Sequence, residues 1–263
     1  MENKKYEFTG VTKETWAGPL HQIRAIRDFR NVKAGDIGGW IEKEENLSHD
    51  GDCWVFGDAG VYGNARVFGD AEVYGNAVVY GNARVFGDAG VHGDAKVYGD
   101  AKVFGDAVVY GDAKVFGNAR VYGDTRVFGN AGVHGNARVF GDAGVHGDAK
   151  VFGNAEVYEN AVVYGNAKVF GDAKVYGYAK VFGDAEVYEN AKVTTTVKTF
   201  GNAFIYKITV TDKHIKIGCQ QHLKNEWKDF EDRKIIEMDG KKALEFWRMF
   251  KPVLESLGLF EEV

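Results

Sequence analysis

The chain has 263 residues, a formal net charge of −5 at neutral pH and only two cysteines, Cys53 and Cys219. Two cysteines so far apart argue against a disulfide framework and fit a reducing compartment. The acidic balance argues against a general polyanion binder, although it leaves room for a local basic stripe. We find no signal peptide and no apolar run of membrane-spanning length, so the sequence predicts a cytoplasmic protein.

The first segment, residues 1–35, has no repeat and is expected to form a small β cap. Tyr6–Thr9 and Gln22–Ile26 alternate between apolar and polar residues, as strands do. Such a cap would cover the first coil of the segment that follows, which otherwise presents an open sheet edge.

A six-residue repeat fills the middle of the chain. It begins weakly at Ile37–Ile41, and the spacing from Leu47 to Val55 predicts a two-residue bulge near residues 48–51. From Val55 to Val193 every sixth residue is valine, which gives 24 repeats of Val, aromatic, Gly, Asp or Asn, Ala, and one variable residue. Short fixed periods mark architectures in which each unit buries its apolar face against its neighbours.

The repeat predicts one short strand and one sharp corner per unit. Residues two apart point to the same side of a strand, so Ala113 and Val115 are expected inside, and Lys114 and Phe116 outside. Gly followed by Asp or Asn supplies the corner. Three sides close a triangular coil of eighteen residues, and strands about 4.8 Å apart make a prism on the order of 40 Å long. The predicted fold class is therefore mainly β, with residue i stacked on residue i+18.

The repeat degrades after Val193, at Thr194–Thr196. Residues 204–210 and His214–Ile217 predict a hairpin around Asp212. Two amphipathic helices are predicted at Gln221–Phe230 and Gly240–Leu257, with a kink at Pro252. Their predicted apolar face contains Trp227, Leu244, Trp247, Phe250 and Leu254. The predicted domains are thus an N-terminal β cap (1–35), a parallel β-helix (36–206) and a C-terminal cap of a hairpin plus helices (207–263).

In each repeat an aliphatic residue is followed, four positions later, by a small one. This pattern resembles the repeat of left-handed parallel β-helix proteins with hexapeptide repeats. Asp36–Glu42 before the repeats, and Ile217–Cys219 with His222 and Trp227 after them, are similar to members found in bacteria and their prophages. These proteins are commonly labelled acyltransferases. The resemblance implies a triangular prism, a homotrimer with parallel prism axes and, in the enzymes, a histidine base near a subunit boundary.

The histidines within the coils are the weak catalytic candidates. His92, His134 and His146 each occupy the aromatic position of a repeat, and each follows a glycine two residues earlier. His92 and His146 are expected on one face, about 14 Å apart. No loop interrupts the coils, so aromatic replacement is favoured over a role as general base. Gly90, Gly132 and Gly144 either leave room for a ligand beside the histidines or relieve crowding of the side chains there.

Metal sites are not predicted. Asp88, Asp106, Asp124 and Asp142 fall in one corner column, and stacked carboxylates can bind calcium, but turn chemistry already explains each of them. Cys219 and His222 have the spacing of half a zinc site without a second pair. We expect these two residues to serve helix capping and burial.

The outward positions predict a binding surface. Phe or Tyr fills 20 of the 24 aromatic positions, which gives three ladders. Basic residues beside stacked aromatic rings suit cation–π contacts and anionic or nucleic-acid ligands. Alternatively, the ladders only stabilise the sheet while the basic residues keep it in solution. The candidate ligand- or partner-binding residues are Arg66, Arg84, Lys102, Arg120, Arg138, Phe68, Phe86, Phe104, Tyr122 and Phe140.

Three functions remain open. The favoured one is a non-catalytic binding or scaffolding protein that self-associates, with a trimer favoured, and engages a partner or anionic ligand through aromatic and basic faces. The second is a CoA-dependent acyltransferase with its active site between subunits, and acetyl-CoA is expected only in that case. The third is a prophage-encoded protein that captures a host factor or nucleotide.

Overall fold

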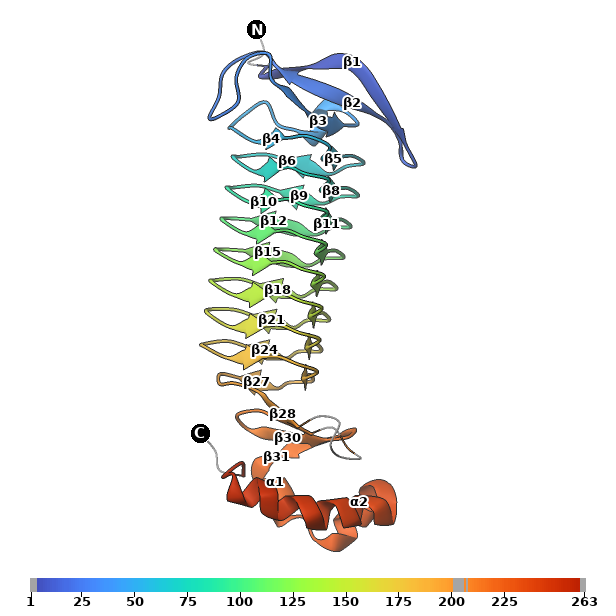
Figure 1. Ribbon diagram of the computed structural model, residues 1–263, viewed down its shortest axis with the longest axis vertical. Coiled ribbons are helices and arrows are strands. Elements are labelled where there is room, and N and C mark those ends of the chain that lie inside the picture. The colour runs from blue at the N-terminus through green and yellow to red at the C-terminus, as the bar shows by residue number, and fades with distance from the viewer. Residues whose placement is uncertain (1–3, 201–205, 207, 261–263) are drawn as a thin grey trace.

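The computed structural model describes residues 4–200, 206 and 208–260. Its main body is a parallel β-solenoid, which Figure 1 shows as a column with a hairpin at the N-terminal end and helices at the C-terminal end. The mainly β fold with a cap at each end, predicted from the repeat, is confirmed.

The N-terminal cap is an antiparallel hairpin that continues into the solenoid. Strand β1 (Tyr6–Thr15) pairs with β2 (Gly18–Ala25), and β2 pairs antiparallel with β3 (Ile37–Ile41). On its other edge β3 pairs in parallel with β5 (Gly60–Val61). Strand β3 therefore joins the hairpin to the first coil, and the predicted N-terminal strands are confirmed.

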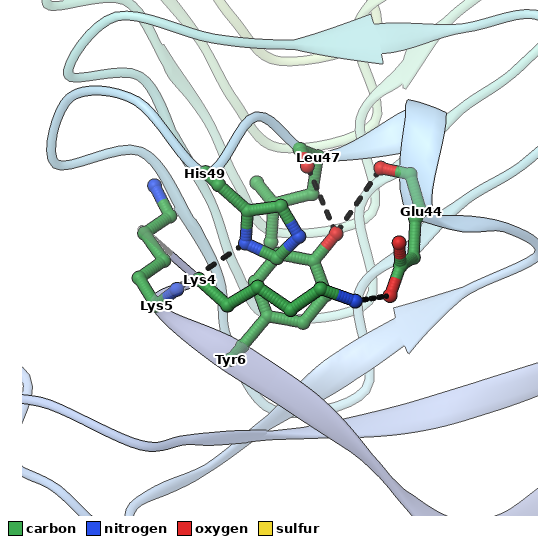
Figure 2. A network of polar contacts seen from close by, with 6 residues as sticks. All are labelled: Lys4, Lys5, Tyr6, Glu44, Leu47 and His49. Carbon is green, nitrogen blue, oxygen red and sulfur yellow. Dashed lines mark hydrogen bonds and ion pairs between the residues drawn. The ribbon is translucent and has the colours of Figure 1, made fainter. Parts of the chain in front are cut away.

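Tyr6 anchors this cap to the first coil (Figure 2). Its hydroxyl donates hydrogen bonds to the backbone carbonyls of Glu44, in the 3-10 helix η1 (Glu44–Asn46), and Leu47, at 3.1 and 2.9 Å. Its ring stacks on the His49 imidazole with 4.2 Å between centroids. The Lys4 ammonium pairs with the Glu44 carboxylate at 2.8 Å. Burial raises the pKa of Tyr6, so the hydroxyl remains a donor.

The predicted bulge is confirmed in the first coil. Ile41 pairs with Val61, twenty residues later, whereas Val55 pairs with Val73, eighteen residues later. The two additional residues therefore lie between Ile41 and Val55, and every later coil keeps the eighteen-residue period.

The repeats form three parallel sheets, and we call their outward surfaces the β5, β4 and β6 faces. The β5 sheet contains β5, β8 (Val78–Val79), β11 (Lys96–Val97), β14 (Lys114–Val115), β17 (Gly132–Val133), β20 (Lys150–Val151), β23 (Lys168–Val169) and β26 (Glu186–Val187). The β4 sheet contains β4 (Trp54–Val55), β7 (Glu72–Val73), β10 (Gly90–Val91), β13 (Val108–Val109), β16 (Arg126–Val127), β19 (Gly144–Val145), β22 (Val162–Val163) and β25 (Lys180–Val181). The β6 sheet contains β6 (Arg66–Val67), β9 (Arg84–Val85), β12 (Lys102–Phe104), β15 (Arg120–Tyr122), β18 (Arg138–Val139), β21 (Glu156–Val157), β24 (Lys174–Val175) and β27 (Lys192–Val193).

The core is a column of valine and alanine. Ala113 and Val115 are both 0% exposed, while Lys114 is exposed and Phe116 half-buried, so the predicted assignment of inside and outside is confirmed. Thr125 replaces alanine in one repeat, and its buried hydroxyl donates to a backbone carbonyl at 2.7 Å. The sequence period thus builds a continuous apolar core without unpaired polar groups at this position.

The C-terminal cap begins with a four-stranded antiparallel sheet. It contains β28 (Lys198–Phe200), β29 (Ile208–Val210), β30 (His214–Ile217) and β31 (Gln220–Leu223). The pairing of β29 with β30 confirms the predicted hairpin. The beginning of its predicted first strand, Phe204 and Ile205, and Lys207 lie outside the described residues. The predicted domain boundary at 206/207 also falls at this gap and stays a prediction.

The helix boundaries differ from the prediction. Helix α1 (Lys224–Asp229) starts late because Gln220–Leu223 pairs with β30 instead. Helix α2 (Asp232–Ser256) consists of two helical segments that meet at Asp239 and Gly240, so the predicted second helix corresponds to its second segment and the first segment was not predicted. The prediction of a kink at Pro252 is wrong, since the backbone leaves the helical region at Asp239 and Gly240. The predicted apolar face is confirmed: Trp227, Trp247, Phe250 and Leu254 are buried, and Leu244 packs against them.

Candidate binding face

A ladder of stacked rings runs along the β6 face. Adjacent strands are parallel and in register, so equivalent rings lie directly above one another. Ring centroids are 4.7 Å apart between Phe68 and Phe86 and 4.8 Å apart between Phe86 and Phe104. Tyr122 and Phe140 extend the ladder at 4.7 and 5.0 Å. These side chains are half-buried, so each ring keeps an outward edge in solvent.

A basic stripe runs beside this ladder, and the structure therefore brings all ten predicted binding residues onto one face. The four arginines are exposed and the lysine is half-buried. In the part of the chain that the structure describes, only Arg138 among them forms an ion pair, with Glu156 at 3.5 Å. Intramolecular cation–π contacts occur elsewhere in the described residues, for example between the Lys216 ammonium and the Tyr188 ring, at 4.0 Å from the ring centroid. The stripe consists of Arg66, Arg84, Lys102, Arg120 and Arg138.

The two corners that border the β6 face differ in charge. The corner after the ladder carries five successive aspartates, whereas the corner before the basic stripe is mostly asparagine. Across the face the order is therefore neutral corner, basic stripe, aromatic ladder and acidic corner. The acidic column consists of Asp70, Asp88, Asp106, Asp124 and Asp142, and the neutral corner of Asn64, Asn82, Asp100, Asn118 and Asn136.

Asparagine side chains in the corners connect one coil to the next. Asn82 donates to the Asp100 carboxylate at 3.0 Å, and Asn118 donates to the Asn136 amide oxygen at 3.1 Å. The six-residue pattern predicts turn formation for these residues, but it does not predict the contact between coils. The signal that reveals it is the comparison of each corner residue with the one eighteen positions later.

The coil histidines lie inside aromatic ladders. On the β4 face His92 stacks between Tyr74 and Tyr110, with centroids 4.6 and 5.0 Å away. His146 stacks in the same ladder, three coils further on, while His134 lies on the β5 face. Burial lowers the pKa of all three imidazoles. The structure therefore supports the interpretation that they replace Phe or Tyr, and it does not bring the three together.

The glycines beside these histidines do not relieve crowding. A Cβ atom on Gly90 would find its nearest neighbour, Val108 Cγ1, at 3.8 Å, which is an ordinary van der Waals contact. For Gly132 the corresponding distance, to Lys150 Cγ, is 3.9 Å. A methyl group therefore fits at each of these positions, so packing does not require glycine beside the imidazoles.

The Cys219–His222 pair does not form a metal site in the described residues, where no cluster of three or more His, Cys, Asp or Glu is placed to hold an ion. The expectation that Cys219 serves burial is wrong, because its thiol is exposed. The His222 ring packs edge-on against Trp227 at 5.3 Å and Phe230 at 4.9 Å. Burial lowers the pKa of His222 against the opposing effect of Glu226.

Comparison with known proteins matches the repeat itself. The family model described as the YdcK β-solenoid repeat matches residues 79–93 and 119–135. The six-residue repeat of the chain and its parallel β-solenoid are thus similar to those of hexapeptide-repeat proteins. A relative from Escherichia coli (strain K12), named "Uncharacterized acetyltransferase YdcK", is 41% identical over 68 residues. That match covers 23% of this solenoid protein and only 20% of the relative, so the solenoid protein matches about a fifth of the relative's length.

The resemblance to hexapeptide-repeat proteins of the acyltransferase type is thus confirmed at the level of the repeat. Among the described helices of the solenoid protein, none combines the length and the apolar character that crossing a bilayer requires.

Proposed function

We propose that this β-solenoid protein is a non-catalytic scaffold that binds a partner through its flat outer faces, chiefly the β6 face. The observation that supports this proposal is the combination, over five successive coils, of an exposed basic stripe with a stacked aromatic ladder. Exposed apolar rings in a continuous row favour burial against another surface. The basic stripe favours acidic groups on that surface.

The repeat offers little of what acyl transfer needs. A general base must reach its substrate within hydrogen-bonding distance, in a pocket that excludes water. The coil histidines instead lie on sheet faces, each held between two rings. From Val55 to Val193 no extruded loop breaks the six-residue period, so the solenoid builds no wall of its own beside them.

Acyl transfer is the second candidate because the E. coli relative carries an acetyltransferase name. A neighbouring subunit would have to supply the missing wall beside His92, His134 or His146, and acetyl-CoA would be the donor. The glycine beside each imidazole, which packing does not require, is the feature that favours this candidate. The homotrimer that the family resemblance implies would place such sites between subunits.

Turnover assays separate the two functions. The scaffold proposal predicts no release of CoA from acetyl-CoA above background with a broad panel of hydroxyl and amine acceptors. Turnover that disappears in one of the variants His92→Ala, His134→Ala or His146→Ala would identify a base and overturn the proposal. Thermal-shift measurements with acetyl-CoA and a nucleotide panel would also reveal capture of a small anionic ligand.

A further inference from the structure

We infer that the partner of the β6 face is the β6 face of a second copy, with the two solenoids parallel and related by a two-fold axis that runs along the aromatic ladder. This arrangement is a dimer and replaces the homotrimer that the family resemblance implies. This inference rests on the proposed function and names the occupant of that surface. The supporting observation is that basic residues lie on one side of the aromatic ladder and acidic residues lie on the other side.

The basic and acidic positions lie at equal sequence distances on either side of the ladder. Arg84 lies two residues before Phe86, and Asp88 lies two residues after it. A two-fold axis that is parallel to the solenoid and centred on the ladder exchanges the two sides of the face but keeps the height of each coil. Arg84 then lies opposite Asp88 of the partner subunit, while the two aromatic ladders meet in the middle.

The opposite orientation is disfavoured by the same charges. A two-fold axis perpendicular to the solenoid reverses the order of the coils but keeps each side of the face on its own side. Arginine would then face arginine, and aspartate would face aspartate, along the length of the contact. Like charges placed opposite each other across an interface cost free energy and exclude that pairing.

The two charged columns overlap over five coils, from Arg66 to Arg138, and both change in the next coil, where Glu156 replaces a basic residue and Asn160 replaces an aspartate. Outside this overlap the acidic column also contains Asp52, whose backbone N–H donates to the Asp70 carboxylate, and the basic column resumes at Lys174. Glu156 is neutralised within the chain by Arg138 at 3.5 Å and Lys174 at 2.9 Å. Turn formation alone does not explain this match, because the other corner columns mix Asn with Asp freely. A self-complementary contact five coils long does explain it.

The acidic column is available for such a contact in most of its length. Asp88, Asp106, Asp124 and Asp142 are exposed. Asp70, at the N-terminal end, is half-buried, and its backbone carbonyl accepts a hydrogen bond from Arg30 of the cap at 3.0 Å. An anionic polymer on the basic stripe would face this acidic column without compensation, whereas a second copy pairs both columns at once.

The first test measures mass by multi-angle light scattering at micromolar concentration. Wild-type protein is expected at twice the 29.0 kDa mass of the chain. The variant Arg84→Asp/Arg120→Asp is expected to lose the dimer, and adding Asp88→Arg and Asp124→Arg is expected to restore it, because the charges are then exchanged and complementary again. The matched control on the β5 face, Lys96→Asp/Lys114→Asp, is expected to remain a dimer.

The second test determines the orientation in a Cys219→Ser background. Phe68→Cys and Phe140→Cys, introduced singly, are each expected to form a disulfide with the same residue of the second copy upon mild oxidation. An antiparallel pair would instead link Phe68→Cys to Phe140→Cys when the two variants are mixed, and this result would overturn the inference.

Four further outcomes would contradict the dimer. They are a wild-type monomer, a wild-type trimer of the kind that the family resemblance implies, an assembly that survives the β6 charge reversal, and an assembly that the β5 control disrupts. A wild-type monomer that binds heparin through the basic stripe would overturn the dimer and leave the scaffold function standing. Acyl transfer by an intact dimer would overturn the scaffold function and leave the dimer standing. The failure of one proposal can therefore be distinguished from the failure of the other.

Discussion

Thr194 donates hydrogen bonds from both its backbone N–H and its hydroxyl to the carboxylate of Asp212, which lies one coil length further along the chain. Thr195 donates to the same carboxylate from its hydroxyl and its N–H. Within the solenoid such N–H groups bind backbone carbonyls of the next coil, as Phe68 does with Val85 at 3.1 Å. The Asp212 side chain therefore replaces the missing next coil at the end of the repeat.

Removal of this carboxylate should weaken the C-terminal end of the solenoid. The Asp212→Ala variant leaves the N–H groups of Thr194 and Thr195 without an acceptor, and we expect a loss of about 1–3 kcal/mol in the free energy of unfolding. Urea unfolding would measure it. The control Asp112→Ala removes an exposed corner carboxylate and should stay within about 0.5 kcal/mol of wild type. Equal effects in the two variants would contradict the capping role.

The Asp212 carboxylate also predicts a pH dependence. Burial disfavours its charged form, but the hydrogen bonds from Thr194 and Thr195 outweigh that effect and lower its pKa. The unfolded chain therefore binds this proton more readily than the folded protein, and the contribution of Asp212 is lost as the pH falls below about 4. The Asp212→Ala variant should lack this component of acid destabilisation.

The sequence predicts the solenoid in detail because one period determines core, corners and register together. Val115 and Ala113 lie inside for the same reason as every equivalent pair. The ends are less predictable, because their contacts depend on residues far apart in sequence, as the Tyr6 hydroxyl with the Leu47 carbonyl illustrates. Local helical periodicity also failed at Gln221–Leu223, where pairing with β30 outweighs it.

The candidate site was predicted in part. The basic stripe and ladder follow directly from positions eighteen residues apart, and the structure places them on one face. The acidic column was visible in the same way, but each aspartate was explained by its own turn. Its meaning depends on which corner borders which face, for example Asp88 next to Phe86, and this requires the columns to be compared across the whole coil.

Substitution in the core should be costly. Val115→Ala removes two methyl groups from a fully buried position, and we expect a loss of roughly 1–3 kcal/mol in the free energy of unfolding, depending on how far the coil relaxes. Chemical denaturation would measure it. The adjacent Lys114 side chain is exposed, so Lys114→Ala should change the free energy of unfolding by less than about 0.5 kcal/mol. A larger effect at Lys114 than at Val115 would contradict the assignment of inside and outside.

Two glycines of the repeat should respond differently to alanine. Gly111 has φ of +69°, and an added Cβ would lie 3.1 Å from the Gly129 nitrogen, so Gly111→Ala should cost about 1–2 kcal/mol. Gly132 lies in a strand with ordinary backbone angles and space for a Cβ, so Gly132→Ala should be nearly neutral. Thermal unfolding of the two variants would check this difference, and equal losses would contradict the described corner geometry.

The coil histidines should destabilise the protein in mild acid. Their pKa values are lowered by burial, so the unfolded chain binds these protons more readily, and stability falls as the pH drops below about 6.5. The triple variant His92→Phe/His134→Phe/His146→Phe keeps the stacking and should lose several degrees less in Tm between neutral and mildly acidic pH. His214 and His222 are present in both proteins, so their contributions to the pH dependence cancel in the comparison. An unchanged pH dependence would place these imidazoles outside the ladders.

Equilibrium dialysis of the assembled protein against labelled acetyl-CoA is the most direct test of a scaffold without a catalytic site. An enzyme that transfers the acetyl group of acetyl-CoA must bind this donor whatever its acceptor, so the result does not depend on finding the acceptor. The scaffold proposal predicts no saturable binding at millimolar acetyl-CoA. Saturable binding that His92→Ala, His134→Ala or His146→Ala abolishes would contradict it.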